Sequence, residues 1–136
     1  MDLRALLLPE PRRRLPHGRW WNVGARTVHL AATGTLLGGH LFGAGADALM
    51  PWLYVAIASG AAMFAIELYS SLDWLAELGG LAVLLKLALL CVVPFAWDAR
   101  VPILFAVVTV AGIGSHMPGR YRHYSLRYGR VMKETR

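Results

Sequence analysis

The sequence predicts an all-α membrane protein, an up-down-up-down bundle of four transmembrane helices with both termini in the cytoplasm. Hydrophobic residues make up 57% of the 136 residues, which exceeds the usage of ordinary soluble domains. Four apolar segments follow one another, separated only by short polar connections. Eleven of the 14 Lys and Arg residues lie outside these segments, in the two tails. Short connections between sequential helices favour antiparallel packing of neighbours.

The chain divides into three parts. Residues 1–21 form a basic, proline-containing segment, residues 22–117 hold the four spans, and residues 118–136 form a basic tail. Basic flanks stay in the cytoplasm under the positive-inside rule. We therefore expect a multi-pass protein of a bacterial-type inner membrane, with anionic lipid head groups as partners of its tails. Because the net charge of +6 comes mainly from these flanks, it does not indicate a nucleic-acid partner.

The first predicted span covers residues 22–43 and carries Arg26, His29 and His40. Its length is close to what a bilayer's hydrocarbon core requires. Eleven residues return a helix to within roughly 20° of its starting direction, so the two histidines share one face about 16 Å apart in depth.

Two glycines lie on the other side of the same helix, Gly34 and Gly38. They are about 140° and 180° round from His29. This spacing of small residues favours close approach of another helix. We therefore expect a helix to pack against them.

The second predicted span covers residues 50–71. Pro51 occupies its first turn, where proline is tolerated. Ala56 and Gly60 form another pair of small residues at helix spacing, which favours close packing. Glu67 is the ionisable residue of this span.

The remaining predicted spans cover residues 74–97 and 101–117. The third is rich in Leu and Val and contains Lys86 near the middle of the bilayer. The fourth ends at Pro118, because proline cannot continue a helix. The tail that follows is either an interfacial amphipathic helix or a solvated basic segment.

Charged groups inside a bilayer are costly unless they find partners. We predict that Glu67 and Lys86 form a structural ion pair, because their side chains lean toward each other's level from antiparallel helices. Arg26 is the competing partner for Glu67. The alternative for Lys86 is that it extends to the interface without a partner.

The histidines permit two interpretations. Imidazole is a frequent metal ligand and an axial ligand of b-type haem, so His29 and His116 are the candidate ligands of a haem b, with Arg26, Arg120 or Arg122 near its propionates. A metal ion would draw on His29, His40 and His116. The alternative is that His29 only donates a hydrogen bond to a neighbouring helix, and no cofactor is then needed.

Other chemistry has less support. Copper(I) prefers thioether and thiolate ligands, but the methionines show no paired spacing and Cys91 is the only cysteine. Copper is therefore the less favoured metal. We find no phosphate-binding loop, nucleophile elbow or paired carboxylates, so we do not expect the chain to be an enzyme on its own.

Two runs of sequence resemble a known family. RTVHLAATGTLLGGHLF (26–42) and LLKLALLCVVPFAWDAR (84–100) resemble the helix pair of CopD-type (copper resistance D-like) membrane domains. The shared features are a basic residue early in one helix, a Gly-Gly near its end and a lysine opening a Leu-rich helix. The resemblance implies copper import or haem-linked redox chemistry, with Arg26, His29 and Lys86 as the positions of interest.

Taken together, the sequence predicts an accessory or cofactor-carrying subunit of a redox or metal-handling membrane complex, with a role in electron transport. Its expected partners are other membrane subunits or a second copy of the chain. The alternatives are a purely structural or assembly subunit without a cofactor, and CopD-like copper transport. The segment SHMPGRYRHYSLRYGR (115–130) is the most distinctive in the chain, and its role is not indicated by its sequence.

Overall fold

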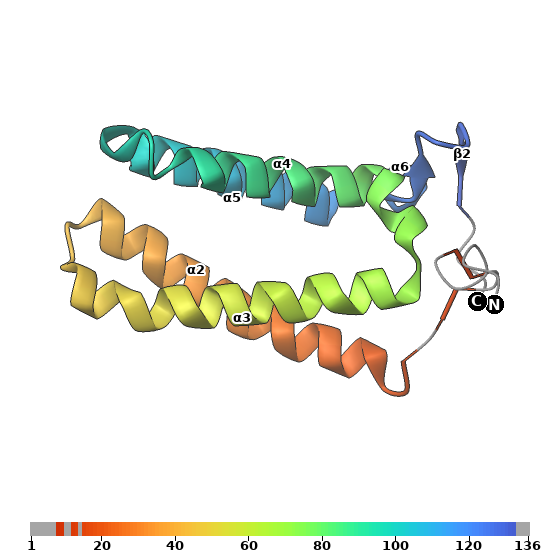
Figure 1. Cartoon of the computed structure of the whole chain (residues 1–136), viewed down its shortest axis with the longest axis horizontal. Helices are drawn as coiled ribbons and strands as arrows, with labels where there is room; N and C mark the ends of the chain where they lie inside the picture. The colour runs from red at the N-terminus through yellow and green to blue at the C-terminus, as the bar shows by residue number, and fades with distance from the viewer. Residues whose placement is uncertain (1–7, 10–11, 14, 133–136) are drawn as a thin grey trace. The chain divides into compact units, whose positions relative to one another are not determined.

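The computed structural model describes residues 8–9, 12–13 and 15–132, and these are mostly helical (Figure 1). The α-helices are α2 (Gly18–Leu41), α3 (Ala46–Ser70), α4 (Leu78–Val92), α5 (Arg100–His116) and α6 (Gly119–Arg122). The other elements are the 3₁₀-helices η1 (Leu72–Ala76) and η2 (Trp97–Ala99) and the two-residue strands β1 (Tyr124–Ser125) and β2 (Arg130–Val131). Residues 1–7, 10–11 and 14 of the predicted basic segment 1–21, and residues 133–136 of the predicted tail 118–136, lie outside the described residues.

The chain folds as two units. Residues 13–70 form the α2–α3 unit, in which the two long helices run antiparallel side by side (Figure 1). Arg12 belongs with residues 71–132 in the α4–α5 unit, which also contains α6 and the antiparallel β1–β2 hairpin. The predicted all-α class is confirmed in this outline, and the short hairpin is an addition to it.

The turn between α2 and α3 is built by a helix C-cap. Gly43 has a φ of 70°, a left-handed conformation that glycine adopts without steric cost. The Ala44 N–H donates to the Gly39 carbonyl at 2.8 Å, and the Phe42 N–H donates to the Gly38 carbonyl at 2.9 Å. This hydrogen-bond pattern satisfies the last carbonyls of α2 and reverses the chain.

Small residues let α2 and α3 approach closely. Ala32 and Ala56 are buried between them, and a Cβ added to Gly60 would lie 3.1 Å from the His29 imidazole. The expected close packing at Ala56 and Gly60 is therefore confirmed. A Cβ added to Gly39 would in turn collide with the Leu49 side chain.

The helix packing predicted at Gly34 and Gly38 does not occur within the α2–α3 unit, and packing by a further helix stays a prediction. A Cβ added at either position would meet nothing within 4 Å. The reason is geometric, because α3 packs on the face of α2 that carries His29, and these glycines lie on the opposite side. The small-residue face of α2 is thus open in the α2–α3 unit.

The third helix is shorter than the predicted span of 74–97. It begins only after Glu77, whose backbone is extended with φ −83° and ψ 154°. It ends at Val92, two residues before Pro94, which has no N–H to continue the ladder. At about 1.5 Å per residue, its 15 residues reach roughly 22 Å.

In the α4–α5 unit, glycines again set the helix spacing. A Cβ at Gly114 of α5 would lie 3.3 Å from the Ala82 Cβ of α4, so the two backbones approach closely there. Gly80 is buried beneath η1. A Cβ at Gly80 would collide with the Trp74 carbonyl oxygen and lie 3.0 Å from the Leu75 Cα.

Several polar side chains are buried in the described residues, and many large apolar ones are exposed. Among the described residues, the buried polar side chains belong to Ser59, Ser71, Asp73, Glu77 and Ser125, and the buried apolar ones to Ala32, Leu49 and Ala56. Large apolar side chains along all four long helices are exposed. Such extensive apolar surface is typical of contact with lipid or protein partners.

Two described helical segments are long and apolar enough to cross a membrane, Ala46–Ser70 and Trp97–His116. In the first segment, 11% of the most apolar stretch is buried. In the second segment, none of the most apolar stretch is buried. The core helix of a soluble protein would be mostly buried instead. Helix α4 is apolar but shorter.

We predict that Gly80→Ala destabilises the α4–α5 unit by roughly 1–3 kcal/mol, because the added methyl has to displace the backbone of η1. Gly112→Ala is the matched control, since a Cβ there would meet nothing within 4 Å and alanine favours a helix by up to about 1 kcal/mol. Unfolding in detergent, followed by tryptophan fluorescence, measures both. Equal stability of the two variants would contradict the packing of η1 on Gly80.

Candidate functional site

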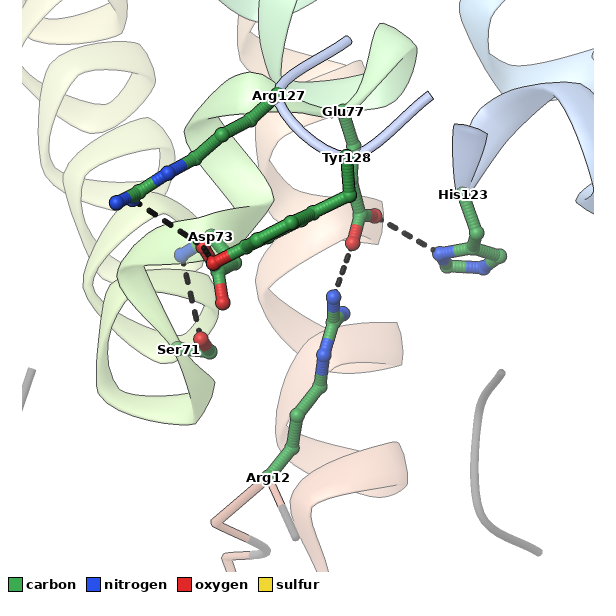
Figure 2. Close-up of polar contacts among 7 residues, drawn as sticks. All are labelled: Arg12, Ser71, Asp73, Glu77, His123, Arg127 and Tyr128. Carbon is green, nitrogen blue, oxygen red and sulfur yellow. Dashed lines mark hydrogen bonds and ion pairs between the residues drawn. The ribbon is translucent and has the colours of Figure 1, made fainter. Parts of the chain in front are cut away.

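The most organised group of polar side chains in the described residues surrounds the start of α4 (Figure 2). At its centre is Glu77, whose side chain has no exposed surface. Arg12 donates a hydrogen bond to Glu77 Oε1, and His123 Nδ1 donates to Glu77 Oε2 over 3.0 Å. One carboxylate therefore joins the chain before α2, the start of α4 and the segment after α5.

The two donors keep this carboxylate ionised. Burial is the largest single influence and raises the pKa of Glu77, but the hydrogen bonds and positive charge contributed by His123 and Arg12 together outweigh it. The pKa consequently lies below the ordinary value of 4.5. At neutral pH the group is a buried anion that depends on its two partners.

A second carboxylate lies close by on η1. Asp73 is 4% exposed and accepts a hydrogen bond from the Tyr128 hydroxyl at 3.3 Å. Arg127 Nη1 lies 3.7 Å from the same oxygen. The Asp73 N–H donates to Ser71 Oγ at 3.2 Å, which caps the first turn of η1 (Figure 2). We refer to the seven residues of Figure 2 as the polar cluster.

The tail reaches the polar cluster because it folds into a hairpin. Gly129 adopts a φ of 59°, and its N–H donates to the Ser125 carbonyl at 2.9 Å, which closes the turn. The Leu126 N–H donates to the Ala76 carbonyl at 3.0 Å, and Ser125 pairs with Glu77 as an antiparallel bridge. The distinctive sequence of 115–130 thus encodes a small folded element, and neither an amphipathic helix nor a solvated tail describes it.

The predicted site residues of the α2–α3 unit are only partly brought together. His29 Nδ1 lies 3.0 Å from the Ala56 carbonyl and 3.1 Å from Ser59 Oγ. This is the hydrogen bond to a neighbouring helix that we considered as the alternative to cofactor binding. Arg26 is exposed on α2 and Glu67 half-buried on α3, and they form no ion pair with each other.

The other predicted positions are divided between the two units. His40 lies in the last turn of α2 and His116 in the last turn of α5. Lys86 is on α4, so its predicted partner Glu67 belongs to the other unit. The Glu67–Lys86 ion pair and the pairing of His29 with His116 therefore stay predictions.

The described residues do not bring together a metal-binding or acid–base group. Among the described residues, no three His, Cys, Asp or Glu side chains lie close enough to hold a metal ion. Both oxygens of Glu77 are occupied by donors. A hollow between α4 and α5 is lined only by Leu78, Leu81, Ala82, Leu85, Val110, Ile113, Gly114 and Met117, so it supplies no acid, base or nucleophile. The polar cluster is suited to holding chain segments together.

No family model, curated protein or solved structure matches this chain. The resemblance to CopD-type domains accordingly stays a prediction. The polar cluster itself was missed in the sequence because Glu77 lies inside the predicted third span. The available signal was that one acidic residue interrupts an apolar segment in a chain whose tails are rich in arginine.

We predict that Arg12→Gln destabilises the α4–α5 unit by on the order of 3 kcal/mol, because it leaves a buried carboxylate without its guanidinium partner. Arg127→Gln is the matched control. Its side chain is 54% exposed, so the same substitution should cost less than about 1 kcal/mol. Denaturant unfolding in detergent at neutral pH compares them, and a cost for Arg127→Gln equal to that for Arg12→Gln would refute the central role of Glu77.

Proposed function

We propose that this chain is a four-span inner-membrane protein that acts as an accessory subunit of a redox or metal-handling membrane complex. The observation that carries the membrane location is the exposure pattern, in which helix surfaces are apolar and the buried side chains are small or polar. Such helices need lipid or other membrane helices around them. The open face of α2 at Gly34 and Gly38 supports packing of a further helix there. The redox or metal-handling role rests on the histidines and on the resemblance to CopD-type domains.

Hydrogen bonds between the two ends of each unit support an even number of membrane crossings. In the α2–α3 unit, the Arg13 N–H donates to the Ser70 carbonyl at 3.2 Å, so this unit starts and ends at one level. In the α4–α5 unit, Glu77 before α4 contacts His123 after α5. Each unit therefore runs out and back, as the four-span topology requires.

The charges agree with this topology. Basic residues gather before α2 and after α5, at residues 12–19 and 120–130, whereas the turn after α2 holds Asp47 and the turn after α4 holds both Asp98 and Arg100. The connection between α3 and α4 has no Lys or Arg, so the orientation rests on the two basic tails. The positive-inside rule then assigns the termini and the polar cluster to the cytoplasm. Helices α2 and α4 would be the first and third spans.

Reporter fusions test the topology. We expect fusions near residue 8 and after residue 132 to report the cytoplasm, and fusions in the turns at Asp47 and Asp98 to report the periplasm. Alkaline phosphatase and a fluorescent protein give complementary signals for the two sides. The proposal fails if either terminus is outside, or if the Asp47 and Asp98 turns lie on opposite sides.

A second candidate function is that the subunit carries haem b, with His29 as one axial ligand. The observation that favours it is the contact of His29 Nδ1 with the Ala56 carbonyl, since histidines that ligate metals usually donate their other N–H to such a group. His116 would have to supply the second ligand, and the haem would supply one-electron transfer. The same contact equally serves a structural subunit without a cofactor.

His29→Gln separates these two possibilities. If the residue only joins α2 to α3, the variant folds and the purified protein is colourless before and after the change. If His29 ligates haem, the wild type shows a Soret band that the variant loses while it still folds, because an amide does not replace imidazole as a strong ligand. A Soret band unchanged by the substitution would rule out His29 as the ligand.

A further inference from the structure

The surface formed by α6 and the β1–β2 hairpin carries positive charge that the polar cluster does not neutralise. Residues 12, 71–77 and 118–132 contain five arginines and two carboxylates. Both carboxylates already face partners within the cluster. Three arginines are left, and none of them pairs with a carboxylate of any residue that the structure describes: Arg120, Arg122 and Arg130.

Contacts with tyrosine rings and with Gly79, none of them with an anionic group, hold these three arginines in place. Arg120 donates to the Tyr121 hydroxyl at 2.7 Å and lies 4.5 Å from the centre of its ring. Arg130 lies 6.0 Å from the centre of the Tyr128 ring. The aliphatic part of Arg122 rests on Gly79, where an added Cβ would lie 3.0 Å from the Arg122 Cγ. The surface therefore presents three oriented cations.

Apolar side chains accompany the cations on the same elements. Tyr121 is 46% exposed, Leu126 at the hairpin turn 61% and Val131 of β2 45%. Exposed aromatic, aliphatic and basic side chains together are typical of protein surfaces at a bilayer interface. A surface that binds only soluble polyanions has no need of the exposed leucine and valine.

The elements are also held at a defined height relative to the apolar helices. Arg122 packs on the first turn of α4 through Gly79, and Leu126 is hydrogen-bonded to Ala76, two residues before that helix begins. The interfacial layer of a bilayer is roughly 5–7 Å thick on each side. If α4 and α5 span the membrane, which is the proposed function, the arginines lie at the level of the lipid phosphates.

We propose that α6 and the hairpin form a binding surface for anionic phospholipid head groups, with Arg120, Arg122 and Arg130 as the contacting cations. Guanidinium groups bind phosphate oxygens by charge-assisted hydrogen bonds. Each basic residue near an anionic surface strengthens binding by about fivefold. The three together should therefore change the preference for an anionic lipid on the order of 100-fold.

The test uses the full chain in nanodiscs of equal parts phosphatidylglycerol and phosphatidylcholine, followed by native mass spectrometry of the retained lipids. We expect the wild type to retain phosphatidylglycerol preferentially. The R120Q/R122Q/R130Q variant should lose that preference, whereas the matched R120K/R122K/R130K variant, which keeps the charge, should retain most of it. Should the glutamine variant unfold, Arg130→Gln alone, at an exposed position, should lower the preference about fivefold.

Several outcomes would overturn the proposal. A wild type without lipid preference, or a glutamine variant that keeps it, removes the role of these arginines. Displacement of phosphatidylglycerol by inorganic phosphate would show recognition of free phosphate, and tighter binding of a single-stranded RNA oligonucleotide would show a nucleic-acid surface. Lipid retention is measured without reference to orientation, so reporters placing the tail outside would refute the proposed topology alone.

Discussion

The α4–α5 unit depends on one buried negative charge. A carboxylate without solvent is tolerated only with partners that replace its hydration, and Glu77 finds them in Arg12 and His123. These partners are 65 and 46 residues away in the sequence. Holding them requires the hairpin of the tail to fold against η1 and the chain before α2 to reach the same point. The extended backbone at Glu77 and the glycine at position 80 follow from the same constraint, since η1 must turn back across the first turn of α4.

Within each unit, the two long helices are held together by small residues, and in the α2–α3 unit also by hydrogen bonds. Apolar side chains point outward along them, so burial of large hydrophobic residues contributes little within each unit. Small residues bring the backbones together at Gly60 and Gly114, and His29 joins α2 to α3 by hydrogen bonding. In an apolar solvent there is no hydrophobic drive between helices, and close contact with polar bonds takes its place. This packing is consistent with the proposed membrane location.

The sequence predicts the helices well and the polar cluster poorly, for a physical reason. Apolar runs and the Pro118 boundary place α2, α3 and α5 within a few residues of their observed limits. Contacts between distant segments leave no periodic trace, so neither the pairing of Arg12 with Glu77 nor the folded hairpin at 124–131 could be read from spacing. The same limit applies to Gly34 and Gly38, because a small-residue face indicates that a helix can approach and does not say which one.

The start of α4 illustrates how long-range contacts override local preference. A helix begun at Trp74, as the sequence predicts, would carry Glu77 in its first turn, where the helix dipole favours a carboxylate. The structure instead places Glu77 one residue before the helix, with its side chain turned to Arg12 and His123. A buried ion pair adds little net stability compared with apolar packing, but a misplaced charge is strongly penalised. The polar cluster therefore acts chiefly by excluding other positions of α4 along its axis, since any such shift would separate the Glu77 carboxylate from its two donors.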